Sequence, residues 1–175
     1  METLHTEVLV LGSGTAGSNA ARSAAHAGAE HVTLIQPTNL INTCVEEGCM
    51  PSKSILAGAQ HKESLEQVQS IRNAHIDRLL RALTESLHAE TFAIVSGHAT
   101  FIDDNTVLVV DGDNKTTYSA QSIVIATGSN PFLPAIEGLS TLGDRLLISD
   151  DVAAKKAHFN EVPKRVLTIG GGLLA

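Results

Sequence analysis

The sequence predicts an α/β fold in which a mostly parallel sheet has flanking helices and a small antiparallel β-meander. Two observations support this prediction. Near the N-terminus, an apolar run that ends in glycine is followed by an Ala-rich stretch and a second apolar run, which is the order of a βαβ unit of about 30 residues. From about residue 92 to 118, short β-like segments are separated by turn signals. The first pattern is typical of a Rossmann-type sheet.

The βαβ unit is predicted in three pieces. Residues 8–11 form a continuous apolar run, which favours a strand buried on both faces. The Ala-rich residues 16–27 predict a helix that ends at Gly28. Residues 31–35 predict the next strand.

Two further helices are predicted after this unit. Asn42 or Thr43 could cap a helix over residues 44–58. Residues 61–88 carry apolar side chains near helical spacing and therefore predict a long amphipathic helix.

Strands dominate the rest of the chain. The segments expected to be β-strands are residues 92–95, 98–102, 106–110, 115–118, 122–126 and 166–169. A short helix is expected near residues 150–156. The last expected strand leads into a glycine turn, and such a turn normally leads into a helix. We therefore expect residues 1–150 to form the first, incomplete part of one nucleotide-binding domain. Residues 151–175 would be a crossover and the truncated start of a second one.

Composition excludes several classes of function. The net charge of −7 and an aromatic content of 3% argue against a nucleic-acid partner. No apolar run approaches the roughly 20 residues that a membrane span needs, and the N-terminus lacks the features of a signal peptide. We expect a soluble, cytoplasmic protein, in which two cysteines favour catalysis or metal binding over a structural disulfide.

A glycine-rich motif joins the first strand to the first helix. Its GxGxxG spacing lets the first glycine make a tight turn, the second admit a pyrophosphate and the third bring the helix close to the strand. The free N–H groups at the helix N-terminus favour negative charge there. The alternative is a tight turn that binds nothing. The motif consists of Gly12, Ser13, Gly14, Thr15, Ala16 and Gly17.

The ribose-binding acid expected about 20 residues after this motif is replaced by Gln36. An amide oxygen can still accept a hydrogen bond from a ribose hydroxyl, but without the help of a negative charge.

A second motif, CxxxxC, contains Cys44 and Cys49, with Lys53 one turn further on. A disulfide across so short a loop would contribute only roughly 2 kcal/mol to stability, so it would be a poor structural link. A helix N-terminus and a cation lower thiol pKa values, which suits disulfide exchange. A zinc site is a weaker alternative, because zinc takes four ligands and there is no second cysteine pair. No metal site is predicted, and two inert thiols are the remaining alternative.

Taken together, the motifs resemble the N-terminal part of the pyridine nucleotide–disulfide oxidoreductases, which include dihydrolipoamide dehydrogenase, glutathione reductase and mercuric reductase. The matching stretches are the Gly12–Gly17 turn, residues 44–53, residues 123–129 and the terminal turn at residues 170–175. The resemblance implies a catalytic role for Cys49 as the charge-transfer thiolate near the flavin and for Cys44 as the interchange thiol. It places Lys53 near the flavin N5 edge.

The resemblance also implies the cofactors and partners. FAD would be bound by the glycine motif, Gln36, Thr43 and the turn at Ala126, Thr127 and Gly128. Gly170 and Gly172 would begin the NAD(P)-binding turn. NAD(P)H would reduce FAD, and the electrons would pass through the Cys44–Cys49 disulfide to a small-molecule or protein disulfide, or to another acceptor. The intact protein is expected to be a homodimer.

The sequence departs from the family at Ile41 and Asn42, where two glycines are usual; these side chains are expected to crowd the flavin or alter the loop. The 175-residue chain alone is expected to be inactive and to bind FAD weakly or not at all. A non-catalytic flavin- or nucleotide-binding module is the alternative function.

Overall fold

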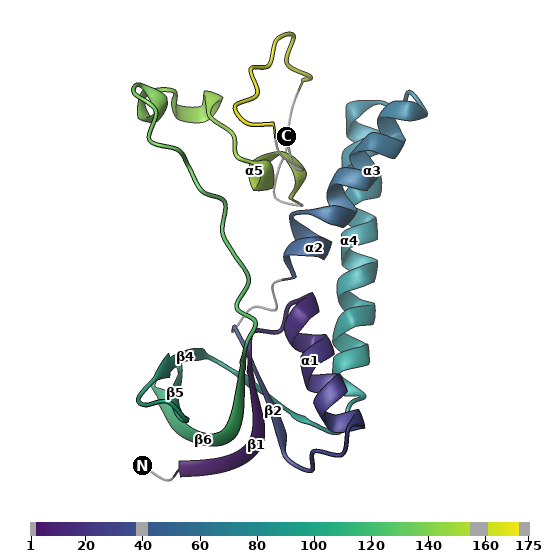
Figure 1. The fold of residues 1–175 in the computed structure, drawn as a ribbon. Helices are drawn as coiled ribbons and strands as arrows, with labels where there is room; N and C mark the ends of the chain where they lie inside the picture. The colour runs from purple at the N-terminus through teal and green to yellow at the C-terminus, as the bar shows by residue number, and fades with distance from the viewer. Residues whose placement is uncertain (1–2, 38–41, 155–160, 172–175) are drawn as a thin grey trace. The chain divides into compact units, whose positions relative to one another are not determined.

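The computed structural model describes residues 3–37, 42–154 and 161–171. These residues belong to two compact units (Figure 1). The first unit contains Met1–Asn42 and Ala82–Ser129, and the second contains Thr43–Arg81 and Asn130–Ala175. The glycine motif therefore lies in the first unit and the two cysteines lie in the second.

A six-stranded sheet in the order β3-β2-β1-β6-β5-β4 forms the centre of the first unit. β1 pairs in parallel with β2 and β6, and β2 pairs in parallel with β3. β4 and β6 each pair antiparallel with β5. The predicted α/β fold, with a mostly parallel sheet and an antiparallel part, is confirmed. The strands are β1 Thr3–Leu11, β2 Val32–Gln36, β3 Ala93–Ser96, β4 His98–Phe101, β5 Thr106–Asp111 and β6 Asn114–Ile125.

The end of β1 is buried on both faces of the sheet. Leu9 and Leu11 belong to one apolar cluster with residues of β5 and β6, whereas Val10 belongs to another with residues of the helices. Side chains alternate between the faces of a strand, so a continuous apolar run supplies both clusters. This confirms that the strand predicted over residues 8–11 is buried on both sides.

Helix α1, Thr15–His26, lies beside the sheet in Figure 1. Ala21 of this helix packs in the second cluster with Leu87 and Phe92. Arg22 strengthens the contact, because its Nε lies 2.6 Å from Glu90 Oε1 and its guanidinium donates to Ser86 Oγ. α1 thereby fixes the glycine motif against the end of β1.

The second unit is mainly helical, with α2 Thr43–Glu46, α3 Cys49–Gln60, most of α4 Leu65–His88 and α5 Ser149–Ala153. Ser64 and Gln67 cap the start of α4 reciprocally, each side chain accepting from the other's backbone N–H. α3 and α4 approach closely where Gly58 faces Val68, since a Cβ at Gly58 would lie 2.5 Å from Val68 Cγ2.

The structure corrects four of the element predictions. The helix expected over residues 44–58 is two helices, because the chain turns at Glu47 and Gly48. The segments expected at 115–118 and 122–126 are one strand, β6, which pairs with β1 on one side and β5 on the other. The first segment of the expected meander, β3, pairs in parallel with β2. Residues 166–169 form no strand, and all four are exposed.

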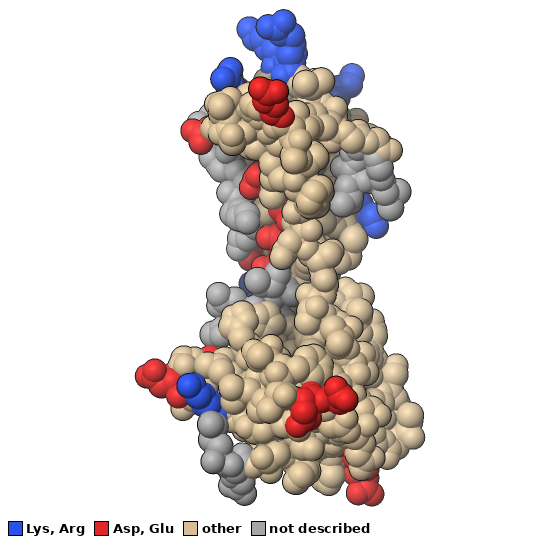
Figure 2. Space-filling view, turned by 60° about the vertical axis from the view of Figure 1, so that its left-hand side comes forward, with Lys and Arg blue, Asp and Glu red and all other residues tan. Residues whose placement is uncertain are grey.

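None of the helices within the described ranges is both long enough and apolar enough to cross a membrane. On the face drawn in Figure 2, the described Lys and Arg side chains gather at one end of the second unit, and over the first unit charged groups are scattered. That face of the first unit therefore presents no basic patch among its described residues.

Candidate functional site

The glycine motif forms a closely packed junction between β1, α1 and the turn after β6. Gly12 has a φ of +107°, and a Cβ on it would lie 2.3 Å from the carbonyl oxygen of Ala126. A Cβ on Gly17 would lie 1.7 Å from the carbonyl oxygen of Gly12. Both positions therefore require glycine. The close packing brings together Gly12, Gly17 and Ala126, three of the residues predicted to bind the cofactor.

The same junction is open where a ligand would approach. A Cβ on Gly14 would meet no atom of the described residues within 4 Å, so the packing of these residues does not require glycine at this position. The Ser13 side chain is buried, and its Oγ has no hydrogen-bond partner among the described residues. The first N–H groups of α1 have no intrahelical acceptor and favour an anion. These features fit the pyrophosphate of a dinucleotide.

Gln36 lies at the end of β2, where the ribose-binding acid was expected. Its side-chain nitrogen lies 3.4 Å from Ser96 Oγ, and Ser96 is its partner in the register of β2 and β3. With its nitrogen directed to Ser96, the amide oxygen of Gln36 remains an acceptor for a ribose hydroxyl. The sequence did not identify Ser96, because only the pairing of β2 with β3 brings it beside Gln36.

Asn42 does not project into open space. Only 3% of it is exposed, and its Nδ2 lies 3.4 Å from Oγ1 of Thr15, the first residue of α1. Asn42 therefore packs against the glycine motif. Its side chain was expected to crowd a flavin or alter the loop, and that expectation stays a prediction. Ile41 lies outside the described residues.

The remaining predicted cofactor residues are less tightly placed. Ala126 donates its N–H to Leu11 O at 2.8 Å, and Thr127 and Gly128 follow on the exposed side of this turn. Ala16 is exposed at the start of α1, and Thr43 is exposed as the first residue of α2. Gly170 is exposed with no preceding strand, and Gly172 lies outside the described residues.

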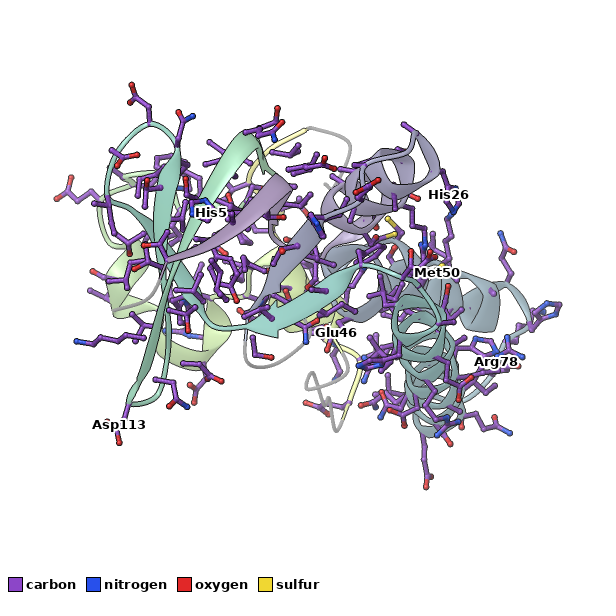
Figure 3. All side chains as sticks on the ribbon, turned by 90° about the horizontal axis from the view of Figure 1, so that it is seen from below. His5, His26, Glu46, Met50, Arg78 and Asp113 are labelled. Atoms are coloured by element: carbon purple, nitrogen blue, oxygen red, sulfur yellow. The ribbon has the colours of Figure 1, made fainter. Side chains whose placement is uncertain are left out.

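The two cysteines are held by two different helices of the second unit. Cys44 is in the short helix α2, whereas Cys49 is the first residue of α3. Two neighbouring residues are labelled in Figure 3: Glu46 is the last residue of α2, and Met50 is the second residue of α3. At the N-cap Gly48, a Cβ would lie 3.0 Å from the carbonyl oxygen of Thr43, so the two helices meet closely.

The structure brings the two sulfur atoms together as free thiols that share a hydrogen bond. This hydrogen bond raises the pKa of Cys44, and burial and the negative charge of Cys49 raise it further. The backbone N–H of Cys49 and, to a smaller extent, the positive charge of Lys53 lower the same pKa, but their effects are weaker. The predicted low pKa is therefore wrong for Cys44, because its hydrogen bond with the Cys49 side chain and its burial outweigh the groups that lower the pKa.

Lys53 is exposed four residues after Cys49, on the same side of α3. Cys49 is exposed, whereas Cys44 is half-buried. Among the described residues, no group of three or more His, Cys, Asp or Glu side chains is arranged to hold a metal ion. The arrangement is a dithiol beside a cation, which can form and break a disulfide.

Residues 6–175 match the model of a known family, the pyridine nucleotide-disulphide oxidoreductases. The chain belongs to this family. The similarity covers the glycine turn, the thiol pair and the described part of the crossover. The resemblance drawn from the motifs is thereby confirmed.

Curated relatives include two dihydrolipoyl dehydrogenases. The one from Geobacillus stearothermophilus is 33% identical, with 98% of this chain and 38% of the relative aligned. The one from Haemophilus influenzae is also 33% identical over the same shares. The chain thus spans 38% of the length of these oxidoreductases.

Solved structures give the same fold. The Cu(II) complex of the HOCl-induced flavoprotein disulfide reductase RclA from Escherichia coli is similar with a TM-score of 0.71 and 25% identity. The similarity covers 81% of this chain and 32% of that one.

The two thiols of this oxidoreductase chain should differ in reactivity. In the reduced protein at neutral pH, iodoacetamide should modify Cys49 several-fold faster than Cys44, because Cys49 is exposed and the raised pKa of Cys44 lowers its thiolate fraction. The Cys44 rate should then rise as the pH passes through that raised pKa. Tandem mass spectrometry of the peptide that contains both residues measures the two rates.

A Cys49→Ser variant provides the control. Because Cys49 is the main cause of the raised pKa, Cys44 should react faster in the variant than in the wild-type chain. Faster modification of Cys44 than of Cys49 in the wild type at neutral pH would contradict the assignment.

Proposed function

We propose that this chain is the flavin-binding, dithiol-bearing part of an FAD-dependent disulfide oxidoreductase, in which Cys44 and Cys49 form the redox pair. The observation that carries the proposal is the contact between the two thiols at the start of α3. The glycine motif supports a dinucleotide in the same chain, because Gly14 leaves space and the Ser13 hydroxyl has no partner among the described residues.

Except for Thr43, the residues that would hold FAD lie in the first unit. The pyrophosphate would lie against the Gly12–Gly17 turn, and Gln36 would accept a hydrogen bond from the adenosine ribose. Ala126, Thr127 and Gly128 border the turn from β6, and Thr43 would contribute from the start of α2. When bound, FAD supplies the electron pair, taken from NAD(P)H, that reduces the disulfide.

The dithiol performs the exchange with substrate. The Cys44 thiolate attacks one sulfur of a substrate disulfide, forms a mixed disulfide and expels the other sulfur as a thiolate that takes up a proton. The Cys49 thiolate then attacks the Cys44 sulfur. This step forms the Cys44–Cys49 bond and releases the second substrate thiol, so two electrons and two protons leave the pair.

Lys53 assists the ionisation that this chemistry requires. Its positive charge lowers the pKa of Cys44, against the effect of Cys49. Because a thiolate and not a thiol attacks a disulfide, this lowering favours the first step of the exchange.

The rest of the proposal concerns the intact protein. Its domains would be a flavin domain over residues 1–150 and a second, NAD(P)-binding domain that begins after residue 150, with Gly170 and Gly172 in its glycine turn. We propose a cytoplasmic homodimer that acts on a small-molecule or protein disulfide. These parts rest on the family and on relatives of which the chain spans 38%.

A single-turnover experiment tests the proposal without a nicotinamide domain. Because the chain alone is expected to bind FAD weakly, the oxidised chain is mixed anaerobically with a large excess of photoreduced FAD, and free thiols are counted by alkylation and mass spectrometry. Both cysteines should appear as thiols in the wild-type chain. If no thiol appears, the pair does not accept electrons from the flavin.

Gly14→Ala is the matched control, since it leaves both cysteines in place and should obstruct only the phosphates. Thiols should form more slowly in this variant; equal rates would mean that reduction occurs in solution and not from bound FAD. Binding of FAD, seen as quenched flavin fluorescence, without any reduction of the pair would instead support a non-catalytic flavin-binding module.

A further inference from the structure

We propose that Asn42 is a positioning residue of the dinucleotide site, because its amide orients the hydroxyl of Thr15 so that the hydroxyl proton is available to a phosphate oxygen. This inference deepens the proposed function and rests on it. It concerns a residue that stands where the family usually has a glycine, and both residues belong to the first unit.

The contact is built into the fold. Asn42 is 3% exposed, and its Nδ2 donates to Thr15 Oγ1 over 3.4 Å. A polar side chain is buried at a cost in free energy unless its groups are hydrogen-bonded. The amide is thus held at the first residue of a helix of 12 residues, in contact with that residue's exposed side chain.

The chemistry of the hydroxyl decides what this contact does. A threonine hydroxyl has one O–H to donate and two lone pairs that accept. Since the amide N–H occupies one lone pair, the hydroxyl proton must point elsewhere. Thr15 therefore becomes a donor at the N-terminus of α1.

A second hydroxyl supports a ligand at this place. Ser13, in the same turn, is 1% exposed, and its Oγ has no partner among the described residues. A buried hydroxyl without a partner costs free energy, which a bound acceptor would recover. Between these two residues, Gly14 leaves open space. The two hydroxyls and the helix N–H groups are all donors, so they suit an anionic oxygen acceptor such as a phosphate.

The proposal can be tested by replacing the amide of Asn42 with a carboxylate. An aspartate at position 42 has nearly the same shape, but it can only accept, so it would take the Thr15 proton away from the phosphate. Its negative charge would also repel the phosphate while it stabilises the N-terminus of α1. Binding and stability should therefore respond differently to Asn42→Asp.

The experiment titrates the 175-residue chain with ADP, which carries the pyrophosphate but no flavin. Amide resonances of Gly14, Thr15 and Ala16 are followed by NMR up to millimolar ADP. Asn42→Ala should weaken binding about tenfold, the effect of roughly one lost hydrogen bond, and Asn42→Asp should weaken it more. The thermal midpoint of the ligand-free Asn42→Asp chain should stay at or above that of the wild type.

Two Thr15 variants distinguish positioning from a structural role. Thr15→Val should weaken ADP binding about as much as Asn42→Ala, and the double variant should be no weaker than either single one, because both remove the same donor. Thr15→Ser keeps the hydroxyl and should bind as the wild type does.

The possible outcomes separate the positioning role of Asn42 from the dinucleotide site on which it rests. If ADP binds the wild type and the Asn42 variants equally, or if the Asn42 and Thr15 effects add, the positioning role is wrong and the dinucleotide site stands. If millimolar ADP leaves the glycine-motif resonances of the wild type unchanged, the dinucleotide site itself is wrong, and the role of Asn42 falls with it.

Discussion

Replacing Cys49 with serine should remove the internal disulfide of this chain completely. A serine hydroxyl cannot form a sulfur–sulfur bond, and Cys44 would have no other cysteine in the sequence to pair with. In a disulfide reductase that contains this chain, the turnover of a disulfide substrate should fall by at least about 10³-fold, as expected when a covalent catalytic group is lost. Cys44→Ser should have the same effect on the internal disulfide.

The measurement is an equilibrium with reduced and oxidised glutathione, followed by alkylation and intact-mass analysis. The wild-type chain should change directly from two free thiols to none. The Cys49→Ser chain should instead accumulate a glutathione adduct at Cys44. Gln60→Ala, a change at the exposed far end of the same helix, should retain the wild-type behaviour. A wild-type chain that forms only glutathione adducts would contradict the redox pair.

Replacing Gly17 with alanine should prevent stable folding of the first unit. Alanine normally favours a helix over glycine by about 1 kcal/mol. At this position, however, the added Cβ would lie 1.7 Å from the carbonyl oxygen of Gly12, and neither backbone can move without separating α1 from β1. We expect a loss of more than about 3 kcal/mol of stability, beyond the usual cost of overpacking. Urea unfolding followed by circular dichroism measures it.

Gly14→Ala is the matched control within the same motif. Gly14 has a φ of −60°, which alanine adopts readily, and its Cβ would meet nothing within 4 Å. This variant should be as stable as the wild type or slightly more stable, while its binding of ADP or FAD is weakened. If Gly14→Ala lost as much stability as Gly17→Ala, the different surroundings of the two glycines would not explain why each position carries glycine.

Much of the fold could be predicted because it follows from local pattern. The apolar run before the glycine motif predicted a strand buried on both faces, and Leu9 and Val10 lie in different clusters as that requires. The end of α1 followed from Gly28. The strand expected at residues 166–169 failed, because an apolar run becomes a strand only where another strand pairs with it.

The sequence predicted which residues make up the candidate site, but not how these residues interact. The spacing of Cys44, Cys49 and Lys53 predicted a redox pair, whereas the hydrogen bond of Cys44 with the Cys49 side chain, together with burial, reverses the expected direction of the Cys44 pKa. The hydrogen bond of Asn42 to Thr15 joins residues 27 positions apart in the sequence. Sequence spacing does not reveal such contacts.

The sequence by itself determined the βαβ unit, the glycine motif and the presence of a dithiol, because backbone conformation and hydrophobic periodicity act over short stretches of chain. The tertiary structure alone decided that Ser96 orients Gln36 and that Asn42 meets Thr15. It also decided that Cys49 raises the pKa of Cys44. The physical reason is that hydrogen bonds and burial depend on which segments are neighbours in space, and sheet register and helix packing set those neighbours.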